Sequence, residues 1–184
     1  ITLYGEALKE ANLSNERRAT LHNDRGIAFW RASQPKAAIE EFNHSVALLP
    51  EGAAAYNNRG NVLLALDLTA EAIKDFDRAI VLTPGYVAAY NNRGTAHLKA
   101  GQLELAALDF SRAIELQPQS PGPIMGRGRA RLAQGRPHAA LRDFSRAVGL
   151  DAKDATGFRY RAKAYLEIDH AGEAIEDFNR AISL

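Results

Sequence analysis

The chain has 184 residues, of which 46% are hydrophobic, so it is long and apolar enough to bury the core of a domain. Its formal net charge is +1, which gives no reason to expect nucleic acid as a bulk electrostatic partner. The absence of cysteine excludes disulfides, thiolate catalysis and cysteine-ligated metal, but it fits a reducing or an oxidising compartment.

No stretch reaches the about 20 consecutive apolar residues that a membrane-spanning helix needs, so no membrane insertion is expected. The chain begins at Ile1 without a methionine or a charged-then-apolar leader. We therefore expect a fragment or a processed form, with any targeting signal upstream. The localisation stays unknown, and a bacterial source would allow the cytoplasm or the periplasm.

Residues 1–18 precede the regular part of the sequence. Tyr4, Ala7 and Leu8 mimic the apolar spacing of a second helix in the copies that follow, so this segment is expected to form a partial preceding repeat. Ser14 is placed to cap the next helix, because serine side chains accept hydrogen bonds from the free N–H groups of a helix start.

From residue 19 onward the sequence repeats itself every 34 residues. Asn-Arg-Gly at 58–60 returns at 92–94, and alanine and phenylalanine recur twelve and sixteen positions after each glycine. The five copies are residues 19–52, 53–86, 87–120, 121–154 and 155–184, the last of them incomplete. A strict period of this kind indicates a stacked solenoid.

Each copy is predicted to be a pair of helices. In the second copy, apolar residues at spacings of three and four predict helices over 53–66 and 70–82, joined by a turn at 67–69. Glycine inside a helix costs roughly 1 kcal/mol relative to alanine, so we expect Gly60 to allow close helix approach beside Phe76. Prolines at 50, 84 and 118 are expected to end the second helices of the first three copies.

These columns of glycine, alanine, phenylalanine and proline resemble the tetratricopeptide repeat, in an Asn-Arg-Gly subtype with five repeats. The resemblance covers residues 19–184. It implies an all-α fold, a right-handed α-solenoid of stacked antiparallel helical hairpins in one continuous domain, whose first helices line a concave groove. Members often end in a capping helix, and Leu184 stops before one, so an exposed end is expected. Such an end can pair with another copy of the chain.

Arginine departs from the family pattern, because it precedes the glycine column where many members have leucine. An acidic residue follows each arginine by sixteen positions, which predicts a ladder of ion pairs across the hairpins, since a desolvated guanidinium needs a partner. The predicted pairs are Arg25–Glu41, Arg59–Asp75, Arg93–Asp109, Arg127–Asp143 and Arg161–Asp177. The alternative is that both columns are merely solvated surface.

Polar residues occupy the columns that the resemblance assigns to the groove. The predicted groove residues are Asn23, Asn57, Asn58, Asn61, Asn91, Asn92, Thr95, Lys99, Arg129, Arg159 and Lys163. A carboxamide both donates and accepts, so spaced asparagines can bind the backbone of an extended peptide. The cations of the later copies can receive acidic side chains or a terminal carboxylate. Alternatively, Asn58 and Asn92 only tie neighbouring hairpins together.

No catalytic, metal or cofactor site is expected. The five histidines lack the spacing of metal ligands, and the glycines near residue 126 do not follow a strand as a phosphate loop would. Arg127 and Arg129 lie about 200° apart around a helix and cannot form one RNA-binding face. The family's carboxylate clamp for chaperone tails also fails, because Gly122 and Gly126 replace the cations that it needs.

The leading hypothesis is a protein–protein interaction module that binds an extended peptide segment in its concave groove and acts as an adaptor or assembly scaffold. The expected partner is a protein or peptide with acidic residues or a free carboxylate. One alternative is a regulatory or substrate-recruiting domain of a larger enzyme. Another is a self-associating structural scaffold, a homo-oligomer formed through uncapped ends.

Overall fold

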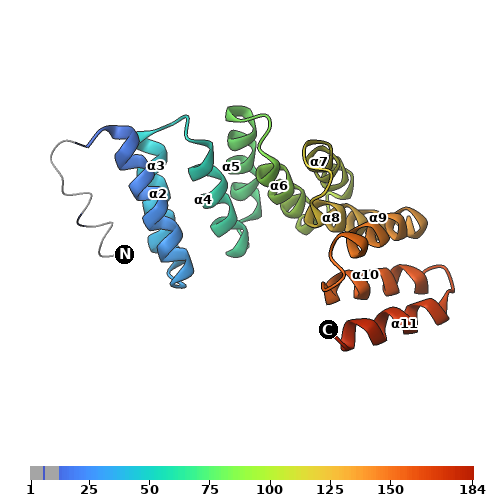
Figure 1. Ribbon diagram of the computed structural model, residues 1–184. Coiled ribbons are helices and arrows are strands. Elements are labelled where there is room, and N and C mark those ends of the chain that lie inside the picture. The colour runs from blue at the N-terminus through green and yellow to red at the C-terminus, as the bar shows by residue number, and fades with distance from the viewer. Residues whose placement is uncertain (1–5, 7–12) are drawn as a thin grey trace. The chain divides into compact units, whose positions relative to one another are not determined.

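The computed structural model describes Glu6 and residues 13–184, and its regular elements in that part of the chain are all helices (Figure 1). The helices are α2 (Asn15–Arg31), α3 (Pro35–Leu48), α4 (Ala53–Ala65), α5 (Thr69–Leu82), α6 (Val87–Lys99), α7 (Leu103–Leu116), α8 (Pro121–Ala133), α9 (Pro137–Leu150), α10 (Ala155–Leu166) and α11 (Ala171–Ile182). Tyr4, Ala7 and Leu8, expected in a partial repeat, lie outside the described residues. Within the described part, no helix is both long and apolar enough to cross a membrane.

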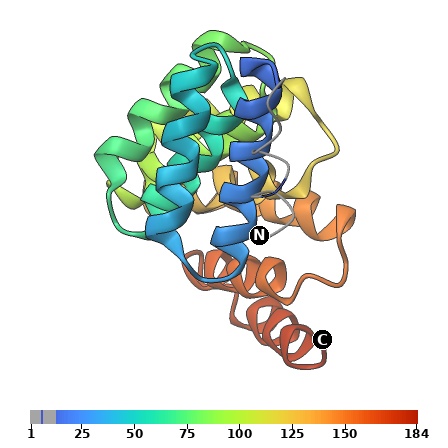
Figure 2. The same cartoon turned by 90° about the vertical axis from the view of Figure 1, so that its left-hand side faces the viewer.

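The chain divides into two compact units, Ile1–Ala96 and His97–Leu184, and the division falls within α6. In the first unit α2 packs against α3 and α4 packs against α5, and Figure 2 shows α2 and α3 running alongside each other. In the second unit α8 pairs with α9 and α10 pairs with α11, while α10 also packs against α9. Each of these pairs is a helical hairpin, as the period predicts.

Buried phenylalanines and small residues form the core of each hairpin. Phe76 is 0% exposed and shares a core cluster with Ala72 and Ala96. A Cβ atom added to Gly60 would lie 2.7 Å from Cε1 of Phe76, so glycine is needed for the two helices to approach this closely. A Cβ atom added to Gly128 would likewise lie 2.5 Å from Cε1 of Phe144. The predicted reason for the glycine column is therefore confirmed.

The arginine ladder is confirmed within the two units. Four arginines each donate two hydrogen bonds, from Nε and Nη2, to one buried carboxylate sixteen residues later, at distances of 2.6 to 3.1 Å. These pairs are Arg25–Glu41, Arg59–Asp75, Arg127–Asp143 and Arg161–Asp177. Arg93 and Asp109 belong to different units, so their predicted pairing stays a prediction.

Candidate functional site

Asparagine side chains join successive first helices in the first unit. Asn58 on α4 donates from Nδ2 to Oδ1 of Asn23 on α2, at 2.9 Å. Asn92 on α6 donates in the same way to Asn57 on α4, at 3.0 Å. Each bond joins residues 35 positions apart, so the amides tie one hairpin to the next, as the alternative interpretation of these residues proposed.

These bonds use only part of each carboxamide's capacity. An asparagine side chain has two N–H donors and an oxygen acceptor, and Asn58 and Asn92 each give one donor to the helix before them. Asn57 is 5% exposed, so its partner bond is largely shielded from water. Asn61 makes no side-chain hydrogen bond to the described residues, whereas the Thr95 hydroxyl donates to the Asn91 carbonyl at 2.9 Å. Asn61 and the half-buried Asn58 thus keep bonding groups for a ligand.

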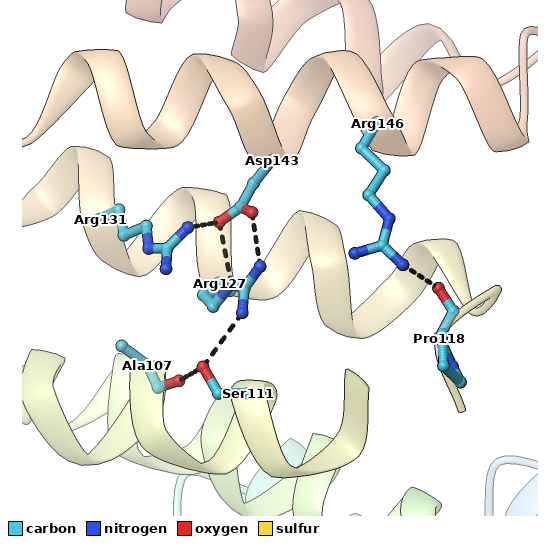
Figure 3. A network of polar contacts seen from close by, with 7 residues as sticks. All are labelled: Ala107, Ser111, Pro118, Arg127, Arg131, Asp143 and Arg146. Atoms are coloured by element: carbon cyan, nitrogen blue, oxygen red, sulfur yellow. Dashed lines mark hydrogen bonds and ion pairs between the residues drawn. The ribbon is translucent and has the colours of Figure 1, made fainter. Parts of the chain in front are cut away.

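Two of the arginines on α8 are held by a single carboxylate. In Figure 3, Arg127 and Arg131 both point to Asp143, whose side chain is 4% exposed. Arg127 also donates from Nη1 to the Ser111 hydroxyl on α7, at 3.2 Å. Burial lowers the pKa of Arg131, and Asp143 opposes that shift. Both guanidiniums are committed to the packing of the hairpin and are not available to a ligand.

Arg129 takes a different direction from its neighbours on α8. Its guanidinium carbon lies 5.2 Å from the centre of the Tyr160 ring, and Nζ of Lys163 lies 5.4 Å from the same centre. Tyr160 in turn stacks on Phe144, with ring centroids 5.8 Å apart. Neither cation has a carboxylate partner among residues 13–184. The tyrosine ring therefore positions two positive charges that no acidic side chain of the described chain neutralises.

A hollow of about 330 Å³ lies beside this tyrosine. Its lining residues combine cationic and apolar groups: Leu98, Arg129, Leu132, Ala133, Tyr160 and Lys163. A smaller hollow of about 80 Å³ shares Tyr160 and Lys163 and adds Thr156 and Arg159. The residues that line the two hollows lie on α6, α8 and α10, which are first helices of the predicted copies.

The structure brings only some of the predicted groove residues together. Arg129 and Lys163 meet at the larger hollow, and Arg159 lines the adjoining one. The predicted asparagines and Thr95 lie in the first unit, whereas Lys99 is an exposed residue of the second and does not line the larger hollow. The positions of these eleven residues do not test whether they bind a ligand, so their binding role stays a prediction.

Four residues that line the larger hollow were not among the predicted groove residues: Leu98, Leu132, Ala133 and Tyr160. Leu98 and Leu132 occupy one column of the 34-residue period, which reads Trp30, Leu64, Leu98, Leu132 and Leu166. That constant apolar column, three residues after the column of Arg129, was the available signal. The sequence marked Tyr160 only as the residue in the column where the second and third copies have asparagine.

Three histidines in the described part, His22, His97 and His170, lie within hydrogen-bond distance of polar side chains. Nδ1 of His22 lies 2.9 Å from Oε2 of Glu41, and Nδ1 of His97 lies 2.6 Å from Oε1 of Gln102. Hydrogen bonds from Arg25 and His22 hold the pKa of Glu41 below its ordinary value, although burial alone would raise it. No group of three or more metal-ligating side chains comes together among residues 13–184.

The sequence matches two models of the tetratricopeptide repeat, one over residues 23–87 and 125–184 and the other over residues 87–120. No curated protein matches significantly. MamA from Desulfovibrio magneticus RS-1 has a similar structure, with a TM-score of 0.82 and 19% identity, over 91% of this chain and 94% of that one. YrrB, described as a repeat protein of this kind with an unusual peptide-binding site, gives a TM-score of 0.77 and 21% identity, over 98% and 91%. A repeat protein from Parabacteroides merdae gives a TM-score of 0.82 and 18% identity, over 98% and 70%.

Proposed function

Because the chain belongs to the tetratricopeptide repeat family, we propose that it is a protein-interaction module that binds an extended polypeptide segment on its first helices. In this proposal the chain has no catalytic role and serves as an adaptor or assembly scaffold. Its ligand carries acidic groups.

One observation carries this proposal: the larger hollow contains cations without acidic partners. Elsewhere in the second unit Arg127, Arg131 and Arg161 are bound to buried carboxylates. Arg129 and Lys163 instead meet at a tyrosine beside leucine side chains. Concave sites that combine apolar walls with a few convergent polar groups are typical of ligand binding.

The amides of the first unit support the same function by a different chemistry. Main-chain groups of an extended peptide need donors and acceptors, whatever side chains the peptide carries. Asn58 and Asn61 keep such groups after the bonds between hairpins are formed. The resemblance to YrrB, whose reported structure has a peptide-binding site, adds an analogy at the level of fold.

Site-specific cross-linking tests the proposal directly. A photoreactive amino acid at Ala133, an exposed residue that lines the hollow, is expected to capture a polypeptide from the native source. The same amino acid at Leu108, which is 66% exposed on α7 and lines no part of the hollow, is the matched control. Capture from Ala133 should disappear on Lys163→Glu. Equal products from both positions would count against a ligand at the hollow.

A second candidate function, self-association, is favoured by the apolar surface of α11. Ile175 is 59% exposed and Ile182 is 83% exposed, whereas Val148, the equivalent of Ile182 one copy earlier, is 7% exposed. A second copy of the chain could cover this face. Light scattering over a range of concentrations should then show a rising mass for the wild type and a constant mass for Ile182→Lys. A monomer at all concentrations contradicts this function.

A further inference from the structure

We propose that the hollow of the second unit selects an extended segment in which acidic and large apolar residues alternate. This inference rests on the proposed function and specifies its ligand. The acidic residues face Arg129 and Lys163, and the apolar residues face the leucines across from them. The discriminating property is therefore the order of residues along the ligand as well as its composition.

Two parallel rows of side chains cross the first helices of this unit. One row is cationic and consists of Arg129 on α8 and Lys163 on α10. The other is apolar and includes Leu98 on α6 and Leu132 on α8, both of which line the hollow. Arg129 and Leu132 are three residues apart, so they are neighbours on the surface of one helix. The cationic and apolar rows therefore run side by side, about one helical turn apart.

An extended chain lying between these rows has two edges of different character. Successive side chains of a strand point to opposite sides, so residues i and i+2 share one edge and residue i+1 lies on the other. Residues on the same edge are about 7 Å apart, and neighbouring helices are about 8–10 Å apart. Side chains at i and i+2 can thus reach successive members of one row. Alternation of acidic and apolar residues matches both rows at once.

Electrostatics favours an anion on the cationic row. Arg129 and Lys163 both lie within 5.4 Å of the centre of one ring and repel each other, with no carboxylate among the described residues to offset that repulsion. A carboxylate between them gains charge-assisted hydrogen bonds from both. Because the tyrosine already restrains the two side chains, less conformational entropy is lost when the anion binds.

The test compares two fluorescent peptides of about ten residues, acetylated at one end and amidated at the other. In the first, aspartate and leucine alternate; in the second, the same residues stand in two blocks. Fluorescence anisotropy with the full chain should show binding of the alternating peptide at least about tenfold tighter, and raising the salt concentration should weaken it. Equal affinities overturn the proposal. Binding that requires a free terminal carboxylate in place of the amide also overturns it, because the site would then recognise a chain end.

Variants locate the binding on the molecule. Arg129→Gln and Lys163→Gln are each expected to weaken the alternating peptide about threefold to tenfold. Arg142→Gln, which removes the same charge from an exposed position on α9 outside the hollow, should leave the affinity unchanged. A loss as large in Arg142→Gln indicates only general charge attraction and contradicts the proposed site.

The outcome separates this inference from the proposed function. A natural polypeptide that cross-links at Ala133 but lacks alternating acidic and apolar residues leaves the interaction module intact and overturns the ligand rule. If cross-linking fails but the alternating peptide binds, the ligand rule stands and the proposed function does not. In that case the hollow recognises the pattern, and the role of the chain as a module for such a cellular partner fails.

Discussion

At the residue scale, position around one helix decides what each arginine does. Arg127 and Arg129 are two residues apart on α8, and about 200° of rotation separates their directions. Arg127 reaches a buried carboxylate on α9, while Arg129 reaches the Tyr160 ring. The same side chain thus stabilises a hairpin at one position and lies over an aromatic ring at the other.

The ladder could be predicted because its acidic partner recurs at a fixed spacing of sixteen residues. Arg131 could not be placed in that way, since the equivalent positions in the other copies hold phenylalanine, leucine, histidine and tyrosine. Its bond to Asp143, at 2.7 Å, depends on the local packing of one hairpin. Periodicity therefore predicts contacts that every copy shares and misses those that one copy adds.

Gly60 tests the close approach between helices. Gly60→Ala should lower the free energy of unfolding by about 1–2 kcal/mol, because overpacking against Phe76 outweighs the gain in helix propensity. Gly149→Ala is the control: an added Cβ there meets nothing within 4 Å, so this variant should be unchanged or up to about 1 kcal/mol more stable. Urea denaturation measures both values. Stabilisation of Gly60→Ala would show that the Phe76 ring can move aside.

Glu41 should make the stability depend on acidity. Its pKa in the folded chain lies below its ordinary value of 4.5, because bonds from Arg25 and His22 outweigh the opposing effect of burial. Its contribution is therefore complete above about pH 4.5 and is lost as the pH falls through the lower, folded-state pKa.

Substitution isolates this effect. Glu41→Gln should reduce the free energy of unfolding at pH 7 by about 1–3 kcal/mol, and its stability should fall less steeply in acid than that of the wild type. Glu40→Gln, at the exposed neighbouring residue, is the control. Urea denaturation between pH 7 and pH 3 measures both. If wild type and Glu41→Gln lose stability in parallel as the pH falls, Glu41 is not the source of the acid dependence.

At the element scale, the helices follow the sequence closely. Helices predicted over 53–66 and 70–82 correspond to α4, Ala53–Ala65, and α5, Thr69–Leu82. Prolines at 50, 84 and 118 lie two residues beyond α3, α5 and α7. However, α9 ends at Leu150 with no proline following, so the same termination occurs without one. A proline is therefore not required to end a second helix.

Helix starts differ in a way that local sequence explains. The Ser14 hydroxyl accepts a bond from the Arg17 N–H, as predicted, and Asp154 accepts one from the Thr156 N–H. Ser120 stands at the equivalent position before α8 but caps nothing with its side chain. Prolines at 121 and 123 remove two N–H groups of the first turn, including the one at the third position that a capping side chain usually reaches.

The difference between these helix starts predicts that alanine destabilises the chain more at residue 154 than at residue 120. Asp154→Ala should lower the free energy of unfolding by about 1 kcal/mol, because it removes the bond to Thr156. Ser120→Ala should change it by less than about 0.5 kcal/mol, since no cap bond is lost. Thermal or urea denaturation distinguishes the two. A loss in Ser120→Ala as large as that in Asp154→Ala would reveal a capping role for the Ser120 hydroxyl.

At the scale of the whole molecule, the candidate site could be predicted only in part. Arg129 and Lys163 stand in columns that the family resemblance assigns to a groove, but their contact with one tyrosine joins two different copies. The same is true of Asn58 and Asn92, whose bonds run to the preceding helix. Sequence columns identify which side chains face the same side. Which of them bond to each other depends on how successive hairpins stack.

Stacking also predicts that stability varies along the second unit. A hairpin whose large apolar side chains are less completely buried opens more easily. Phe144 on α9 is 0% exposed, whereas Phe178, at the equivalent position on α11, is only partly buried. The α10–α11 hairpin should therefore exchange its amide hydrogens sooner than α8 and α9.

The phenylalanine pair provides a matched test of this gradient. Phe144→Ala should reduce the free energy of unfolding by about 3–5 kcal/mol, as expected for a fully buried ring. Phe178→Ala should cost less, about 1–2 kcal/mol, and should speed hydrogen exchange in α10 and α11 without affecting α8. Hydrogen exchange followed by mass spectrometry, together with urea denaturation, measures both effects. Equal costs and uniform loss of protection would mean that the second unit unfolds as one cooperative body, with no weaker hairpin.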